Sequence, residues 1–489
     1  MVIYSGFAVG LLNIYLFTKQ GLFTDTQFGL YNAFIAIATM MMAFSNLAMP
    51  AYIYKFFPYY NEHLPPKKND LLTSALVVST AGYAIVIVAG IVFKGLVVRK
   101  YIEHSPQIVT YYNWIFVLGF GLMMYTILEA YAWQLHKSVF TNYLREVQWR
   151  LFITILILLF LLRIIPDYDL FIKLFSFTYP GIALILFLYL ALTKKIHFTL
   201  QISKVTRRFF KSILRLCSFI YVGTLILTVS QVFDSLVIGA VLTNALGKLA
   251  VYSVAQNIAS MIQAPQRGIV SASIAHLSKA WKDKKLGTIQ RIYQRSSINQ
   301  LIFSCGLYAL IVINFIDAVN TFHLKESYLN GFYVFLFLGA TKIVDMGTGV
   351  NSQIIGTSTY WRFEMTSGIV LLLLILPLNY ILTKQYDIVG TAIANLISIT
   401  IYNLIRIIFL WRKFKLFPFT AQSSYTLVLA GGCFAACYFS FQAIHGLPGL
   451  LLRSIVFCIL YGTGILYLNL SPDVAPIWRS IKQRIGIRG

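Results

Sequence analysis

Residues 231–273 read QVFDSLVIGAVLTNALGKLAVYSVAQNIASMIQAPQRGIVSAS, and this stretch decides the fold. It holds two apolar segments of membrane-spanning length that are joined by a short turn. The first segment contains Asp234, and the second contains several amides followed by Pro265. Because charges and amides in a lipid-spanning helix are costly, they usually face a protein interior or a wet cavity. The stretch therefore predicts a helical membrane protein with a polar interior.

The same pattern occurs a second time near the start of the chain. Residues 23–31 read FTDTQFGLY, and residues 242–252 read LTNALGKLAVY, with two extra residues in the second copy. Each copy leads into a further apolar segment that contains a proline, Pro50 or Pro265. Weak internal similarity at half the chain length is typical of transporters built from two repeated bundles. Chance similarity between two apolar hairpins is the alternative interpretation.

The composition predicts an all-α polytopic membrane protein. Hydrophobic residues make up 58% of the 489 positions and charged residues only 11%, which excludes an ordinary soluble domain. A bilayer core takes roughly 20 helical residues to cross. We expect about fourteen transmembrane helices, at residues 2–18, 29–53, 71–97, 109–134, 147–165, 168–193, 215–241, 248–274, 296–318, 328–350, 364–383, 387–411, 420–443 and 449–470.

These segments and the repeat predict a division of the chain into two six-helix lobes and flanking parts. Amphipathic basic stretches are expected on the membrane surface at residues 199–213 and 277–293 and around Trp478 in the tail. The predicted parts are an N-terminal lobe (1–193), a basic amphipathic cytoplasmic linker (194–214), a C-terminal lobe (215–415), two additional transmembrane helices (416–470) and a basic cytoplasmic tail (471–489).

The charge distribution predicts the orientation in the membrane. The formal net charge is +24. In a membrane protein such an excess is first explained by Lys and Arg in cytoplasmic loops rather than by nucleic acid. If the N-terminus is cytoplasmic, roughly 30 of the 40 basic residues fall in cytoplasmic connections and about nine in outer ones. We therefore expect both termini in the cytoplasm and no nucleic-acid partner.

Signatures of an enzyme are missing from the sequence. It has no GxSxG, Walker A, HExxH or glycine-rich dinucleotide turn, and the outer loops are short. The five cysteines lie in apolar segments without metal-ligand spacing, so we interpret them as buried small hydrophobic residues. We expect neither catalytic residues, nor a cofactor, nor a metal.

The candidate functional residues are polar side chains within the membrane segments. Asp234, with Gln231 one turn earlier on the same face, is interpreted as a proton or cation site or as part of a substrate cavity. A helix–helix hydrogen bond or salt bridge is the alternative. Glu129 allows the same two interpretations, and it could pair with Arg150. Lys342 and Asp345, three residues apart, could pair along one helix face.

Neutral amides add to this set, and they concentrate in the first, second and eighth segments. Singly, each is more often a packing hydrogen bond, and their concentration is the informative feature. These residues are Asn13, Asn32, Asn46, Gln256, Asn257 and Gln263. Four cations near the predicted cytoplasmic helix ends, Arg215, Arg267, Lys342 and Arg362, either extend to lipid headgroups or receive a pyrophosphate.

An ordered set of motifs resembles the Wzx-type polysaccharide repeat-unit flippases of the MOP exporter superfamily, which are related to the MATE exporters and the lipid II flippases. The similarity covers nearly the whole chain, although no single motif is diagnostic. The motifs are FTDTQFGLYNAF (23–34), AYIYKFFPYY (51–60), LREVQWRLF (144–152), VFDSLVIGAVLTNALGKLAVYSVA (232–255), KIVDMGTGVNSQII (342–355) and IVGTAIANLIS (388–398).

This resemblance implies two pseudo-symmetric, MATE-like lobes around a cavity lined by segments one, two, seven and eight. It implies alternating access that moves an undecaprenyl-pyrophosphate-linked oligosaccharide, such as an O-antigen or capsule repeat unit, across the bacterial cytoplasmic (inner) membrane. The expected partners are this lipid-linked oligosaccharide, membrane lipids, H⁺ or Na⁺ as coupling ion, and the polysaccharide polymerase machinery. A cation-coupled exporter of small molecules remains an alternative, and an integral-membrane glycan polymerase or acyltransferase is a weaker one.

Overall fold

The computed structural model describes residues 2–199 and 201–473, and every regular element within them is helical. The prediction of an all-α fold is confirmed. The chain divides into two compact units, Met1–Ala250 and Val251–Gly489. The division falls inside one helix, α13 (Ala245–Ile262). The predicted lobe boundaries at 193 and 215 remain a prediction, and the predicted tail lies almost entirely outside the described residues.

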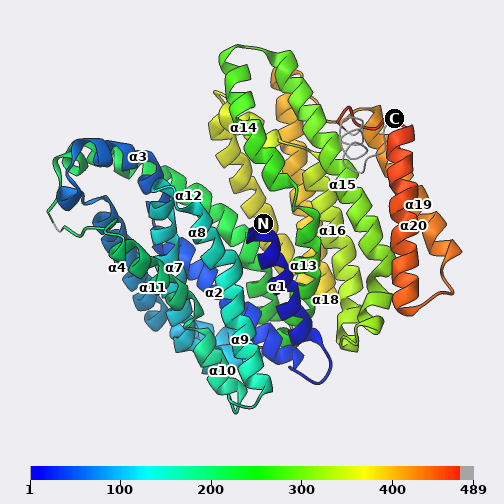
Figure 1. Cartoon of the computed structure of the whole chain (residues 1–489), viewed down its shortest axis with the longest axis horizontal. Helices are drawn as coiled ribbons and strands as arrows, with labels where there is room; N and C mark the ends of the chain where they lie inside the picture. Colours follow the sequence, from blue (N-terminus) through cyan, green and yellow to red (C-terminus); the bar gives the residue numbers. More distant parts are fainter. Residues whose placement is uncertain (1, 200, 474–489) are drawn as a thin grey trace. The chain divides into compact units, whose positions relative to one another are not determined.

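The helices follow the chain in the order shown by the colours of Figure 1. Before α13 they are α1 (Val2–Thr18), α2 (Asp25–Ser45), α3 (Met49–His63), η1 (Pro66–Lys68), α4 (Leu71–Val92), α5 (Lys94–Tyr101), α6 (Pro106–Thr110), α7 (Tyr112–Gln134), α8 (Ser138–Tyr143), the π-helical turn η2 (Leu144–Gln148), α9 (Trp149–Leu161), α10 (Tyr168–Phe175), α11 (Thr178–Leu192) and α12 (Lys204–Val241). After α13 they are α14 (Gln266–Lys282), α15 (Leu286–Thr321), η3 (Glu326–Asn330), α16 (Gly331–Gly347), α17 (Asn351–Thr357), α18 (Trp361–Phe414), α19 (Ala421–Ser440) and α20 (Gly446–Tyr467).

The protein is a multi-pass membrane protein by the length and apolar character of its helices. In the described part of the chain, nine helices are long and apolar enough to cross a bilayer. One of them, α18, has non-helical backbone at Tyr386 and Asp387 and so contains two of the predicted segments. Each of the fourteen predicted segments is mainly helical, although several contain a break, and fourteen separate crossings are not established by helix length alone.

Two segments that the sequence predicted as continuous are broken at corresponding places. Segment 29–53 divides between α2 and α3, where Leu47 and Ala48 both have positive φ (46° and 59°). The side-chain oxygen of Asn46 accepts a hydrogen bond from the Ala48 amide (2.9 Å), which stabilises this unusual backbone. Segment 248–274 divides at Gln263–Pro265. Proline lacks a backbone N–H, so it is tolerated in the first turn of a helix but disrupts a helix interior. Pro50 and Pro265 therefore explain both breaks.

Three other expectations need correction. The stretch 199–213 is largely the first part of α12, continuous with the apolar segment that follows, rather than a separate surface helix. The stretch 277–293 is divided between α14 and α15 at a turn where Lys284 has positive φ (54°). Four of the five free cysteines are buried as predicted, but Cys458 is exposed. The predicted amphipathic helix around Trp478 lies outside the described residues.

Within the first unit, α2 is the central helix. It packs against α4, α7 and α12, and α7 in turn packs against α11. A close approach fixes one side of α2, because a Cβ atom added at Gly29 would lie 1.8 Å from the carbonyl oxygen of Leu246. Only glycine allows two backbones to come this close. The side chain of Thr24 caps α2 in a reciprocal capping box with Gln27.

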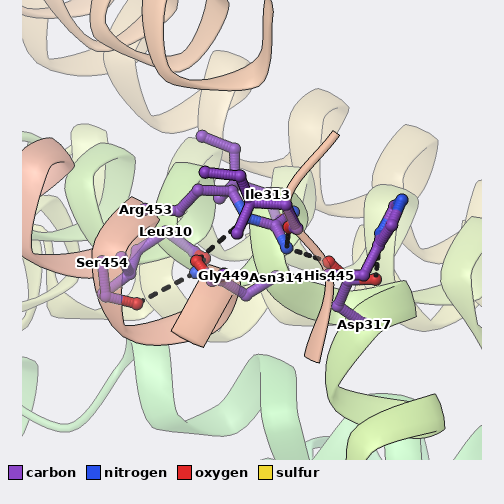
Figure 2. Close-up of polar contacts among 9 residues, drawn as sticks. Leu310, Ile313, Asn314, Asp317, His445, Gly449, Arg453 and Ser454 are labelled. Carbon is purple, nitrogen blue, oxygen red and sulfur yellow. Dashed lines mark hydrogen bonds and ion pairs between the residues drawn. The ribbon is translucent and has the colours of Figure 1, made fainter. Parts of the chain in front are cut away.

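Within the second unit, α15 is the central helix. It packs against α16, α19 and α20. One face of α15, formed by Leu301, Cys305, Ala309 and Ile313, meets apolar residues of α19 and α20. The spacing of four residues between these positions keeps them on one face of a helix. Near one end of this apolar seam the polar contacts of Figure 2 join α15 to the start of α20.

Candidate functional site

The first unit contains a charged cluster built around the π-helical turn η2. The carboxylate of Glu129 on α7 is 5% exposed and lies 3.2 Å from the guanidinium of Arg145 in η2. The sequence predicted Arg150 as the partner of Glu129, and this was wrong. The π-helical turn shifts the positions of the side chains along this stretch, so that Arg145 reaches α7 instead. π-Turns within helices occur frequently at functional sites.

Arg150 pairs with Glu146 of the same segment instead. The two side chains are 3.1 Å apart and about one-fifth exposed. Asn13 on α1 donates its amide to the carbonyl oxygen of Arg150 (2.9 Å) and accepts a hydrogen bond from Thr154 (2.7 Å). Gly10 leaves room for the guanidinium of Arg150 beside α1, since an added Cβ would lie 3.2 Å from Nη1. The cluster thus ties α1, α7 and α9 together through alternating charges.

Two polar atoms of this cluster make no hydrogen bond within the described residues. Oε1 of Glu129 and Nη1 of Arg150 are both buried without a partner among the described residues. A buried polar atom in that condition is a place where a proton, a water molecule or a substrate group can bind. Protonation of Glu129 would also remove its attraction for Arg145 and free a cation whose side chain is already about half exposed (53%).

The second unit has a polar hub at Asp345, near the end of α16. Oδ2 of Asp345 accepts hydrogen bonds from Gln263 (2.9 Å) and Gln266 (3.3 Å), which lie on either side of Pro265. Oδ1 accepts a hydrogen bond from Asn403 on α18 (3.3 Å). One carboxylate therefore holds together the break between α13 and α14, the end of α16 and the second part of α18. The interruption of the helix provides the amide donors that solvate the charge.

Further polar groups extend the hub. Asn351 and Thr348 donate to Oδ1 of Asn403 at 2.9 and 3.1 Å. Beyond them, Glu364 accepts a hydrogen bond from Ser352 (2.6 Å) and pairs with Arg406, which is 4% exposed. Gly349 has a positive φ of 65° and leaves no room for a Cβ atom beside Ser296. Gly349 of the KIVDMGTGVNSQII motif therefore lets the chain turn between α16 and α17.

The predicted site residues are only partly brought together. Asn13 and Glu129 both contact the stretch from Arg145 to Arg150. Gln263 instead binds Asp345 in the second unit. Asp234 is 3% exposed on α12, which packs against α2, α3 and α5, whereas Gln231 one turn earlier is exposed. Asp234 and Gln231 therefore do not share one environment as expected.

The remaining predicted residues have more local roles or more open positions. Asn32 donates to the carbonyl oxygen of Phe28 within α2 (2.8 Å), and Asn46 shapes the break after α2. Gln256 is half-buried and Asn257 exposed on α13. Of the four candidate pyrophosphate contacts, Arg215 and Arg362 are exposed and Lys342 is half-buried, while Arg267 lies in the first turn of α14.

Sequence reasoning missed several charged residues that the structure places in these clusters. Arg145 and Glu146 stand in the quoted motif LREVQWRLF, and one glutamate between two arginines in one short apolar run was the available signal. Asp345 was considered only as a partner of Lys342. Arg406 and Glu364 gave no signal, because they are 42 residues apart and meet only through the fold of α18.

The chemistry available to the two clusters is that of binding and charge movement. Each holds a carboxylate beside cations or amides in helices long and apolar enough to cross the membrane; Glu129 is buried, and Asp345 is half-buried. Across residues 2–199 and 201–473, no three His, Cys, Asp or Glu side chains are grouped to hold a metal ion. Intramembrane ionisable groups of this kind mark ion and substrate pathways.

Comparisons with known proteins agree with this architecture. Residues 2–281 match the family described as polysaccharide biosynthesis protein. A solved structure of the lipid II flippase MurJ in an inward closed conformation is similar at 15% identity over 96% of this chain and 98% of that one, with a TM-score of 0.74. No curated protein sequence matches the chain.

Transporters of the MATE family share the fold as well. An inward-facing multidrug resistance MATE family transporter of the MOP superfamily is 12% identical over 85% of this chain and 95% of that one, with a TM-score of 0.65. A Vibrio cholerae MATE transporter is 13% identical over 85% of this chain and 95% of that one, with a TM-score of 0.53. At such identities the likeness shows the fold, and the match over more than half of the 489 residues shows the family. The chain belongs to the polysaccharide biosynthesis protein family and has the fold of MurJ and the MATE transporters.

Proposed function

We propose that this protein flips a polyprenyl-pyrophosphate-linked oligosaccharide, a repeat unit of a polysaccharide, across the bacterial cytoplasmic membrane by alternating access. The family match over residues 2–281 is the observation that carries this proposal, because it ties a transporter-like fold to polysaccharide synthesis. A flippase needs no catalytic residue of its own. The substrate class also agrees with the name of one structural neighbour, the lipid II flippase MurJ.

The polar interior supports movement of a charged headgroup. Apolar helices that only anchor a protein do not need buried ions, yet each unit here contains a charged cluster within its bundle. Asp234, nearly fully buried on α12, adds a further carboxylate. We infer that Asp234→Asn cuts transport while the protein still inserts, and normal transport by this variant would remove Asp234 from the mechanism.

We infer that H⁺ or Na⁺ couples to transport through the carboxylates of the two clusters. Glu129 fits a proton, because one oxygen binds Arg145 and the other is buried without a partner among the described residues. Asp345 fits a cation, because the amides and the hydroxyl around it also carry oxygen atoms that could ligate one. Lipids of the membrane and the polysaccharide polymerase machinery complete the proposed set of partners.

Export of small molecules is the second candidate function, and the shared fold with MATE transporters favours it. It predicts increased resistance to cationic compounds when the protein is expressed. A membrane-bound glycan polymerase or acyltransferase has less support, because the outer connections are short and no catalytic motif was found in the sequence.

The experiment that tests flipping uses spheroplasts of cells depleted of this protein. Polyprenyl-linked saccharides are isolated before and after treatment with an impermeant glycosidase. Flipping predicts that the saccharides accumulate in a protected pool that faces the cytoplasm. Accumulation in an accessible pool would instead indicate a later step such as polymerisation, and the absence of accumulation would favour the exporter of small molecules.

A further inference from the structure

A groove lies between the two parts of α18, close to where the helix begins and ends. It has a volume of about 420 Å³ and is lined by Phe363 from the first part and by Ile405, Ile408, Phe409, Arg412 and Lys413 from the second. The kink at Tyr386 and Asp387 folds α18 back, which brings Phe363 against Phe409 with ring centroids 3.9 Å apart. The groove is thus formed within one helix pair of the second unit.

The groove is apolar along its length and cationic at one end. Ile405, Ile408, Phe409 and Arg412 follow the spacing i, i+3, i+4, i+7, which is one face of a helix. From Ile405 to Arg412 this face extends about 11 Å at 1.5 Å per residue. Ile408 is 42% exposed and Ile405 is half-buried, so this part of the face is open, while Phe409 packs against Phe363.

Aromatic side chains surround the cationic end. The ammonium of Lys413 lies 5.0 Å from the ring centre of Tyr360, whose ring in turn meets Phe409 and Phe414. Trp411 is 53% exposed beside them. Tyrosine and tryptophan collect at the level of lipid headgroups. This aromatic surround is typical of the depth of the lipid phosphates, and the apolar part of the groove would then face the acyl chains.

The two cations have no acidic partner within the described residues. No ion pair formed by residues 2–199 and 201–473 includes Arg412 or Lys413. The nearest acid in sequence to Phe363, Glu364, is committed to Arg406 and Ser352. Two neighbouring positive charges therefore stand at the mouth of an apolar groove without internal neutralisation, which is the complement of an anionic amphiphile.

We propose that this groove is a binding site for an anionic phospholipid. One acyl chain occupies the face of Ile405, Ile408 and Phe363, and the phosphate binds Arg412 and Lys413. A zwitterionic lipid carries its own ammonium group, which is repelled by the two cations, so it should bind this site more weakly than an anionic lipid. Near an anionic surface each basic residue contributes a roughly equal share of the binding free energy. Losing both should raise the dissociation constant roughly thirtyfold. No residue that lines the groove belongs to the two polar clusters. The proposal does not depend on the transported substrate.

The test uses the purified full-length protein in a neutral detergent. The unfolding temperature is measured while phosphatidylglycerol is added, and phosphatidylcholine with the same acyl chains and inorganic phosphate serve as comparisons. The wild type should be stabilised by phosphatidylglycerol in a saturable way, less by phosphatidylcholine, and not by inorganic phosphate. Equal stabilisation by the two lipids would overturn the proposal, and so would an equal effect of inorganic phosphate.

Variants separate the groove from general surface charge. Arg412→Gln with Lys413→Gln should raise the half-saturating phosphatidylglycerol concentration about thirtyfold. The matched control is Lys67→Gln with Lys68→Gln, two adjacent exposed lysines in η1, and it should leave that concentration unchanged. Ile408→Trp fills the groove without changing the charge and should also weaken binding. Unchanged binding by either groove variant, or equal weakening by the control, would refute the site.

Discussion

Arg453 of α20 and Asp317 of α15 form an ion pair in which the two side chains are only 9% and 11% exposed (Figure 2). The guanidinium also donates to the carbonyl oxygens of Ile313 (3.1 Å) and Ile444 (3.2 Å). On the same helix, Arg295 pairs with Asp473 after α20. The two positions on α15 are about 33 Å apart along the helix, close to the thickness of a hydrocarbon core. Ion pairs therefore fasten α20 and its flank to α15 at both ends of the apolar seam.

The buried pair should be costly to break from one side. Arg453→Leu leaves the Asp317 carboxylate buried without its cation and should lower the free energy of unfolding by about 3–5 kcal/mol. The double variant Arg453→Leu with Asp317→Leu should recover most of this loss, because no unpaired charge remains. Unfolding of the purified variants in detergent measures both effects. Arg295→Leu, in the more exposed pair, is the control and should change stability by less than about 1 kcal/mol. Equal losses for all variants would contradict this account.

Replacing Glu129 tests whether the charged cluster of the first unit acts in transport. Glu129→Gln keeps the shape of the side chain but removes the charge that holds Arg145. We expect transport to fall at least about tenfold while the amount of inserted protein stays near wild type. The readout is the cytoplasmic-facing pool of lipid-linked saccharide. Asp169→Asn, in the more exposed Lys173 pair, is the control and should transport normally. Full transport by Glu129→Gln would exclude a titrating role for this residue.

The Asp345 hub should be sensitive to loss of its charge. Asp345→Asn replaces one acceptor oxygen by a donor, so that Gln263, Gln266 and Asn403 compete for the oxygen that remains. We expect the free energy of unfolding to fall by about 1–3 kcal/mol, with a loss of transport measured in the same saccharide assay. Gln422→Ala removes an exposed amide from α19 and should change neither quantity. Wild-type stability of Asp345→Asn would show that the hub is not needed to hold the broken helix.

Two glycine positions should respond in opposite directions to alanine. Gly29→Ala places a Cβ atom 1.8 Å from a backbone oxygen of Leu246, so α2 has to move and stability should fall by about 1–3 kcal/mol. Gly95 lies in α5, where an added Cβ atom meets nothing within 4 Å. Gly95→Ala should therefore raise stability by about 0.5–1 kcal/mol. The unfolding temperatures of the two variants are compared with that of the wild type. An unchanged unfolding temperature for Gly29→Ala would contradict the close approach of α2 to Leu246.

Acid should weaken the attachment of the residues after α20. Hydrogen bonds from Arg295 and Asn299 hold the pKa of Asp473 below its ordinary value. A carboxylate with a lowered folded-state pKa stabilises the fold above the unfolded-state pKa, near 3.9, and loses that contribution as the pH falls through the lowered value. The unfolding temperature of the wild type should therefore fall more steeply below about pH 4 than that of Asp473→Asn. Parallel curves for the two proteins would rule out this linkage.

The sequence alone determined the class of the fold. Continuous apolar runs of about 20 residues with sparse charges predicted a helical bundle, because only an α-helix satisfies the backbone polar groups of such a run within the run itself. The repeat around Tyr31 and Tyr252 located two corresponding starts of helices, α2 and α13. The prolines at 50 and 265 lie at the helix breaks that follow. These features are local, so residue type and spacing were enough to predict them.

Only the tertiary structure decided which polar residues meet. Glu129 binds Arg145 rather than Arg150 because a π-helical turn shifts the side chains along η2. Gln263 reaches Asp345 across 82 residues, and Arg453 reaches Asp317 across 136. An ion or amide in a membrane helix indicates that a partner is needed. Which residue becomes that partner depends on the packing angles between helices and on where the helices break. Those depend on how the helices of a unit fit together, which sequence periodicity does not specify.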